Sequence, residues 1–204
     1  MSAWAWTALV LFTGYAATAF GVRAVIQARR TGDAGFRGIS GRPGTASWWA
    51  GILFVIALLG GAAAPVAALA GVPALPWAGA APLRWLGLAT AAAGVVATLV
   101  AQSAMGTSWR VGVDSAERTD LVTSGLFATV RNPVFTAMTV TAAGLALMAP
   151  NAVAVLALVG LVAAVQLQVR IVEEPYLAAA HGAAYADYTA RAGRFLPGIG
   201  RRTA

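Results

Sequence analysis

The sequence predicts an all-α integral membrane protein. Of its 204 residues, 59% are hydrophobic and only 10% are charged, whereas soluble domains carry about 25% charged residues. The mean hydropathy is +0.75. Most apolar runs approach the roughly 20 residues that cross the hydrocarbon core of a bilayer. These runs lie at about 3–26, 48–72, 85–105, 133–149 and 152–172. We therefore expect about five transmembrane helices in a single membrane domain, residues 1–204.

The first apolar run is predicted to be a retained helix. Residues 17–19, Ala-Thr-Ala, resemble the cleavage site of a signal peptide. Signal peptides, however, carry their positive charge before the apolar stretch. Here the charge follows it, at Arg23, Arg29 and Arg30.

The arginines also predict the orientation, because cytoplasmic loops are enriched in basic residues. The loop after the first run is basic, which places it in the cytoplasm and the N-terminus outside. Counting forward, the loop around 73–82 is outside, with Arg84 at its edge. The loop before the fourth run and the C-terminal segment are then inside. The arginines expected inside are Arg29, Arg30, Arg37, Arg42, Arg110, Arg118, Arg131, Arg191, Arg194, Arg201 and Arg202, and the acidic residues fall on the same side. The polar chemistry is thus predicted at the cytoplasmic face of the cell membrane.

Composition narrows the possible partners. The net charge is +7, but the arginines lie in short loops between apolar runs, as in membrane proteins, so no nucleic-acid partner is expected. The chain has no cysteine, which excludes disulfides, thiolate metal ligands and a cysteine nucleophile. With His181 as the only histidine, no metal site is expected.

Only Pro150 and Asn151 separate the fourth run from the fifth. This spacing predicts a tight helical hairpin, with these two helices packed side by side.

The stretch "TSGLFATVRNPVFTAM", residues 123–138, precedes and enters the fourth run. Asn132 and Pro133 are favoured at a helix N-cap and first helical position, so a helix start explains both. The loop before them is semi-polar and contains Gly125. Its free backbone N–H groups and the helix dipole also suit a polar ligand.

The end of the fifth run, "VQLQVRIVEEPYL", raises a similar choice. Gln166, Arg170 and Glu174 lie four residues apart and should share one helical face, with Glu173 beside it. Ionisable residues there are costly unless they are paired or face a wet cavity. Either an Arg170–Glu174 ion pair at the interface or a functional site explains them.

Beyond Glu174, a helical stripe predicts an amphipathic helix on the cytoplasmic face. The stripe consists of Leu177, His181, Tyr185 and Tyr188. The tyrosines are typical interfacial aromatics. His181 has the one side chain that titrates near neutrality, and packing or hydrogen bonding within the stripe is its favoured role.

Five motifs follow in order from about Thr119 to Pro197: "LVTSGLF", "RNPVF", "RIVEE", "GAAYADY" and "FLP". Together they resemble the isoprenylcysteine carboxyl methyltransferase family and the related membrane phospholipid methyltransferases. The resemblance covers the C-terminal two-fifths, and the first three helices match only in being hydrophobic. It divides the domain into N-terminal helices, 1–105, and a family-like cofactor-binding portion, 106–204.

The resemblance implies a methyltransferase that uses S-adenosylmethionine without a Rossmann domain. Its acceptor would be lipophilic, either an isoprenylcysteine-type carboxylate or thiol, or a lipid. Glu174 takes the position of the family's cofactor-binding Glu and Arg170 that of its acceptor-contacting Arg, which makes these two the implied catalytic residues. Arg131 would close the site. The residues implied around the cofactor are Thr119, Asp120, Leu121, Val122, Phe127, Arg131, Asn132, Pro133, Val134, Phe135, Glu173, Glu174, Tyr185 and Tyr188.

The sequence departs from the family pattern at three positions. The family His is Asn132, and two Tyr positions are Phe127 and Phe135. Because Asn cannot accept a proton near neutral pH, acid–base chemistry at this position is not expected. Methyl transfer from a sulfonium mainly needs positioning and exclusion of water. A carboxylate or thiolate acceptor entering sideways from the bilayer suits Arg170, whereas an amine needs a base.

Two other functions compete with methyl transfer. Sterol-type membrane reductases resemble the same C-terminal arrangement but bind NADPH, and Arg191 and Arg194 are available for its 2′-phosphate. A non-catalytic scaffold or transport component would use the hairpin only for packing. Thermal stabilisation by S-adenosylhomocysteine or by NADPH distinguishes the alternatives.

Overall fold

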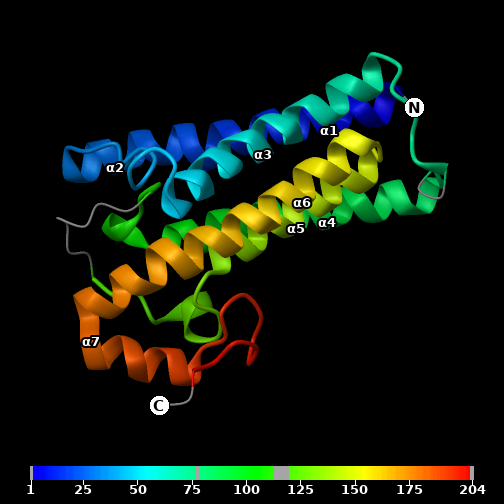
Figure 1. Ribbon diagram of the computed structural model, residues 1–204. Coiled ribbons are helices and arrows are strands. Elements are labelled where there is room, and N and C mark those ends of the chain that lie inside the picture. Colours follow the sequence, from blue (N-terminus) through cyan, green and yellow to red (C-terminus); the bar gives the residue numbers. More distant parts are fainter. Residues whose placement is uncertain (1, 77–78, 113–119, 203–204) are drawn as a thin grey trace.

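The computed structural model describes residues 2–76, 79–112 and 120–202, and these segments are helical with connecting loops (Figure 1). The helices are α1 (Ser2–Ala16), η1 (Ala17–Val22), α2 (Arg23–Thr31), α3 (Ala46–Leu69), α4 (Ala81–Ala104), η3 (Gly106–Ser108), η4 (Gly125–Ala128), α5 (Pro133–Met148), α6 (Ala152–Leu167), η5 (Gln168–Glu173) and α7 (Glu174–Arg191). Two of them, η1 and η5, are π-helical. No strand occurs in the described segments, apart from isolated bridges. The all-α prediction is confirmed.

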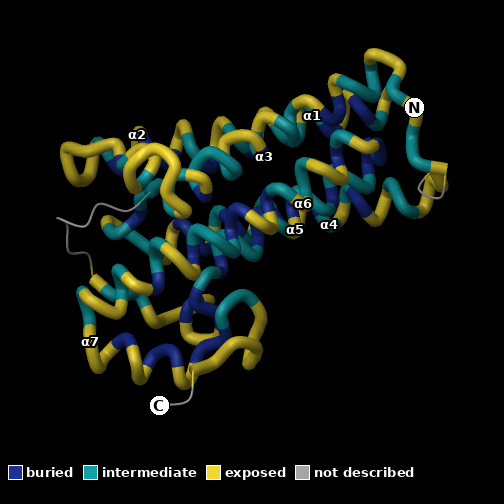
Figure 2. The backbone as a smooth tube through the Cα atoms, viewed as in Figure 1, coloured by how far each residue is buried: buried dark blue, intermediate teal, exposed yellow. Residues whose placement is uncertain are grey.

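Four helical stretches are long and apolar enough to cross a membrane, and α5 is a shorter apolar helix. The four stretches are residues 2–31, 46–69, 81–104 and 152–191. Large apolar residues of these stretches are exposed, for example Leu59 at 65% and Leu156 at 71%. Figure 2 shows exposed positions along the helices of the bundle. Such a surface suits lipid, so the predicted membrane protein is confirmed.

Local signals in the sequence set the helix ends. Thr45 and Asn151 cap α3 and α6, accepting hydrogen bonds from the backbone N–H groups of Trp48 at 3.3 Å and Ala154 at 3.0 Å. Asn132 stands before α5 as predicted, but its side chain makes no cap bond. Instead Nδ2 donates to the Arg194 carbonyl at 3.0 Å.

The helices pack in close pairs. A Cβ atom added to Gly94 or Gly144 would collide with the backbone of Thr141 or Ala91, so α4 and α5 approach backbone to backbone. Small residues allow this approach between membrane helices. On the other side, α6 packs against α3. A short turn, residues 149–151, joins α5 to α6, but α5 packs mainly on α4 and α6 mainly on α3, so the predicted side-by-side hairpin stays a prediction.

The charged side chains gather at one end of the bundle. Among the described residues, all except Arg84 belong to α2, the loop after it, the segment between α4 and α5, η5, α7 or the C-terminal segment. Figure 1 shows α2 and α7 at this end and the N-terminus at the other. After η5 the chain turns, and α7 runs back beneath the charged end of the bundle (Figure 1). The orientation relative to the two sides of a membrane remains a prediction.

Candidate functional site

The charged end of the bundle contains a cavity of about 560 Å³, within the roughly 300–1,000 Å³ typical of small-molecule sites. Every described residue that the family resemblance assigned to the cofactor lines it; Thr119 lies outside the described segments. These lining residues are Asp120, Leu121, Val122, Phe127, Arg131, Asn132, Pro133, Val134, Phe135, Glu173, Glu174, Tyr185 and Tyr188.

The N-terminal helices supply the opposite wall, which the sequence motifs did not indicate. Phe20, Phe54 and Leu58 line the cavity from η1 and α3. The loop after α2 joins the loop after α4: the Arg37 N–H donates to the Val111 carbonyl at 2.9 Å. No signal in the sequence singled out Phe20, Phe54 and Leu58, because they are apolar like the rest of their helices.

Glu174 is the centre of an arginine cluster, which we define as Glu174, Arg131, Arg194 and Arg202. Its Oε1 accepts from Arg131 Nη2 at 3.0 Å and from Arg194 Nε at 2.7 Å. Its Oε2 accepts from Arg194 Nη2 at 3.1 Å and from Arg202 Nη2 at 2.8 Å. A carboxylate offers about four acceptor positions, so these bonds leave none for another ligand.

Arg131 also holds the C-terminal segment. It donates to the backbone carbonyls of Ala192 at 2.6 Å, Thr189 at 3.2 Å and Gly200 at 3.1 Å. The resemblance implied that Arg131 closes the site, and these bonds connect the loop before α5 to the chain after α7.

The hydrogen bond that Arg194 donates to Glu174 raises the pKa of Arg194 above its ordinary value, against the opposing effect of burial.

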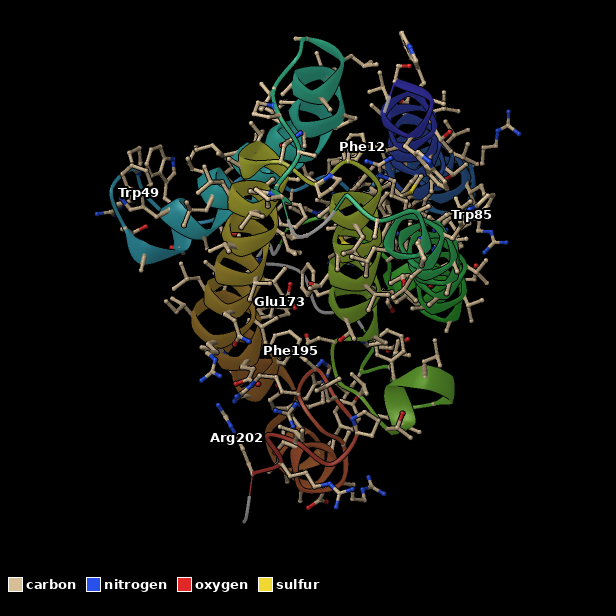
Figure 3. All side chains as sticks on the ribbon, turned by 90° about the vertical axis from the view of Figure 1, so that its right-hand side faces the viewer. Phe12, Trp49, Trp85, Glu173, Phe195 and Arg202 are labelled. Carbon is tan, nitrogen blue, oxygen red and sulfur yellow. The ribbon has the colours of Figure 1, made fainter. Side chains whose placement is uncertain are left out.

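Arg170 does not join Glu174. It is exposed, is not among the cavity-lining residues, and donates from Nε to Gln166 Oε1 at 2.9 Å. The Arg170–Glu174 pair considered from the sequence is therefore not the arrangement of this structure. Both side chains have other partners: three arginines hold the Glu174 carboxylate, and Gln166 holds the Arg170 guanidinium. Glu173 lines the cavity and is hydrogen-bonded by the Gln168 side chain; Figure 3 shows it between α6 and α5.

Comparison with known families agrees with this geometry. The model of the phospholipid methyltransferase family matches residues 83–184, half of the chain. The chain belongs to the phospholipid methyltransferase family. The match runs from α4 into α7 and includes the loop before α5 and the Glu173–Glu174 pair. No match was found among curated proteins.

In this member of the family, the two tyrosines of the predicted stripe face the protein and not the membrane interface. Tyr185 and Tyr188 are 3% and 4% exposed, and the Tyr188 hydroxyl donates to the Phe127 carbonyl at 2.7 Å. The prediction that the two tyrosines lie at the membrane interface is therefore wrong. Both line the cavity, where the resemblance to the family placed them. His181 does not line the cavity. Among the described residues, no group of three or more potential metal ligands occurs.

Proposed function

We propose that this membrane methyltransferase transfers a methyl group from S-adenosylmethionine to a lipophilic acceptor within the 560 Å³ cavity. One observation carries the proposal: the cavity joins the family's motif residues to an apolar wall from the N-terminal helices. Membership of the phospholipid methyltransferase family supports the choice of cofactor, since the family generally uses S-adenosylmethionine. In this proposal residues 106–204 hold the cofactor, and 1–105 contribute the acceptor's apolar surroundings.

Glu173 is the carboxylate that faces the positive charge of the cofactor. The resemblance pointed to Glu174, but its acceptor positions are all occupied by arginines. Glu173 lines the same cavity, and the neutral Gln168 side chain is its hydrogen-bond partner. The backbone around Leu121, Asn132 and Phe135 would enclose the cofactor, and Tyr185 would close it from α7.

The chain's own residues position the reactants and exclude water. When bound, the cofactor supplies an electrophilic methyl group on a sulfonium. The acceptor's nucleophile forms a bond to the methyl carbon while the methyl–sulfur bond breaks, leaving a neutral thioether. Asn132 cannot take up a proton here. An already anionic acceptor, such as the carboxylate or thiolate of an isoprenylcysteine-type molecule, needs no base, whereas a lipid amine does.

Thermal unfolding of the detergent-purified protein tests this function. S-adenosylhomocysteine at about 100 times its Kd stabilises by about 2.7 kcal/mol, so a clear rise in Tm is expected, and NADPH should leave Tm unchanged. Stabilisation by NADPH alone would support the reductase and overturn the proposal. The contacts of Arg194 with Glu174 do not favour the reductase, because they occupy one of the two arginines available for a 2′-phosphate.

We also propose that the cavity lies at the cytoplasmic side of the cell membrane. The gathering of charge at the α2 and α7 end supports this orientation. The acceptor then enters sideways from the inner part of the bilayer.

A further inference from the structure

The two faces of α2 differ in polarity, and the polar face is the one turned inward. Arg23 and Gln27 are 7% and 4% exposed. Arg23 donates to the backbone carbonyl of Gly106, and Gln27 Nε2 donates to that of Thr107 at 2.7 Å. The outer face, in contrast, exposes apolar side chains, for example Val25 at 52%. A helix that is polar toward the protein and apolar toward its surroundings suits contact with lipid.

Five exposed residues make up the outer face, and their spacing places them on one side of the helix. They lie at positions i, i+3, i+4, i+7 and i+8, and they are Val22, Val25, Ile26, Arg29 and Arg30. The three apolar residues come first, and the two arginines follow at the end of α2. We call this surface the outer α2 face.

The helical stretch of residues 2–31 is longer than the core of a bilayer. Its 30 residues span about 45 Å, whereas the hydrocarbon core is about 30 Å thick. The arginine-bearing end is the part expected beyond the core, because a charge inside it is costly. Near the start of α3, which follows at the same end (Figure 1), Trp49 is 49% exposed, as is typical at headgroup level. The outer α2 face therefore places its arginines beside lipid phosphates and its apolar residues beside acyl chains.

The two arginines of the outer α2 face are free to bind an anion. Within the described part of the chain, neither forms an ion pair. Asp33, the acidic residue nearest to them along the chain, is held by Arg37, whose Nη2 lies 2.6 Å from Asp33 Oδ2. The positive charge at the end of α2 is therefore not neutralised by this neighbour.

We infer that the outer α2 face binds an anionic phospholipid, with the phosphate on Arg29 and Arg30 and the acyl chains along the apolar residues. Guanidinium groups form paired hydrogen bonds with phosphate oxygens. A zwitterionic headgroup such as phosphatidylcholine carries a cation beside its phosphate, which the arginines repel. None of the five residues lines the cavity, so this lipid is not the methyl acceptor, and the inference does not depend on the proposed function.

Titration with two lipids that share the same chains, followed by native mass spectrometry, tests the inference. The probes are dioleoyl phosphatidylglycerol and dioleoyl phosphatidylcholine, added to the detergent-purified protein. Each arginine near an anionic headgroup favours binding about fivefold, so the first phosphatidylglycerol should bind about 25-fold more tightly than the first phosphatidylcholine. An equal affinity for the two lipids would overturn the inference.

A pair of double variants tests the position of the site. Arg29→Gln with Arg30→Gln should lower the affinity for phosphatidylglycerol at least tenfold and leave that for phosphatidylcholine unchanged. The matched control, Arg191→Gln with Arg201→Gln, removes the same charge from exposed positions at the same end of the molecule and should keep the preference. An equal loss in both double variants would show a diffuse attraction to the basic end and no site on α2.

Two further measurements complete the test. Soluble sn-glycerol 1-phosphate, which has the phosphate but no chains, should not displace the lipid; displacement at equal concentration would overturn the role of the apolar residues. The Tm without lipid checks that each variant is folded. If the double variant on α2 failed to fold, the single variants Arg29→Gln and Arg30→Gln would decide, since each should lose about fivefold and an unchanged affinity in both would refute the site.

Discussion

Replacement of Glu174 by Gln is expected to destabilise the protein by about 3–5 kcal/mol, because three arginines share its carboxylate. The contribution of each arginine follows from its exposure. Arg131 is 2% exposed beside a Glu174 side chain that is 3% exposed, and loss of one partner of a buried pair costs about 3–5 kcal/mol. Arg202 is 51% exposed, so its bond contributes at most about 1 kcal/mol. Arg194 is 15% exposed and makes two of the four bonds, so the effect is dominated by Arg131 and Arg194.

The change is measured as a shift in Tm. In a chain of 150–250 residues, each kcal/mol shifts Tm by about 2–4 °C, so Glu174→Gln should unfold about 6–20 °C lower. Glu173→Gln is the matched control. It removes no ion pair seen among the described residues, and its Tm without ligand should stay within about 2 °C. Its affinity for S-adenosylhomocysteine should fall about tenfold, or about 1.4 kcal/mol, in calorimetric titration.

The reverse pattern would refute this division of roles. If Glu174→Gln kept its Tm but lost ligand affinity, while Glu173→Gln bound normally, Glu174 would be the carboxylate that faces the donor. The arginine cluster would then rearrange when ligand binds.

Two further predictions concern contacts of the site, and a third concerns the orientation in the membrane. Tyr188→Phe should cost about 1–3 kcal/mol and lower Tm, because it leaves the buried Phe127 carbonyl without its donor; an unchanged Tm would contradict this. Asn132→His should keep S-adenosylhomocysteine affinity, since a ring N–H can replace Nδ2 as donor to Arg194. Loss of binding in a folded protein would show that the "RNPVF" alignment is wrong. A reporter fused at the C-terminus should be active in the cytoplasm, and activity outside would reverse the orientation.

The membrane helices were predictable because each depends on local composition and on end signals. Apolar runs of suitable length, Pro133 and Asn151 mark helices in the sequence, and the structure has helices there. The part of the cavity wall that comes from the C-terminal motifs was also predictable. The motif residues keep their order and spacing, and the described ones line one cavity.

Long-range contacts and irregular helices were not predictable. A period of 3.6 residues placed Arg170 and Glu174 on one face, but it could not show that Gln166 binds Arg170 and that distant arginines bind Glu174. Nothing in the local sequence indicates that Arg194 and Arg202 bind Glu174, because they follow it by 20 and 28 positions. The tyrosine stripe indicated an apolar face on α7 but not what covers it.

The arginine cluster acts as a cross-link in a chain that has no cysteine. The Glu174 carboxylate, at the start of α7, forms ion pairs with the loop before α5 and with two positions of the C-terminal segment. A disulfide would join only two of these points and would depend on the redox state of its surroundings. The ionic junction joins all of them in reducing and oxidising conditions alike. Its buried part is also only weakly screened by salt.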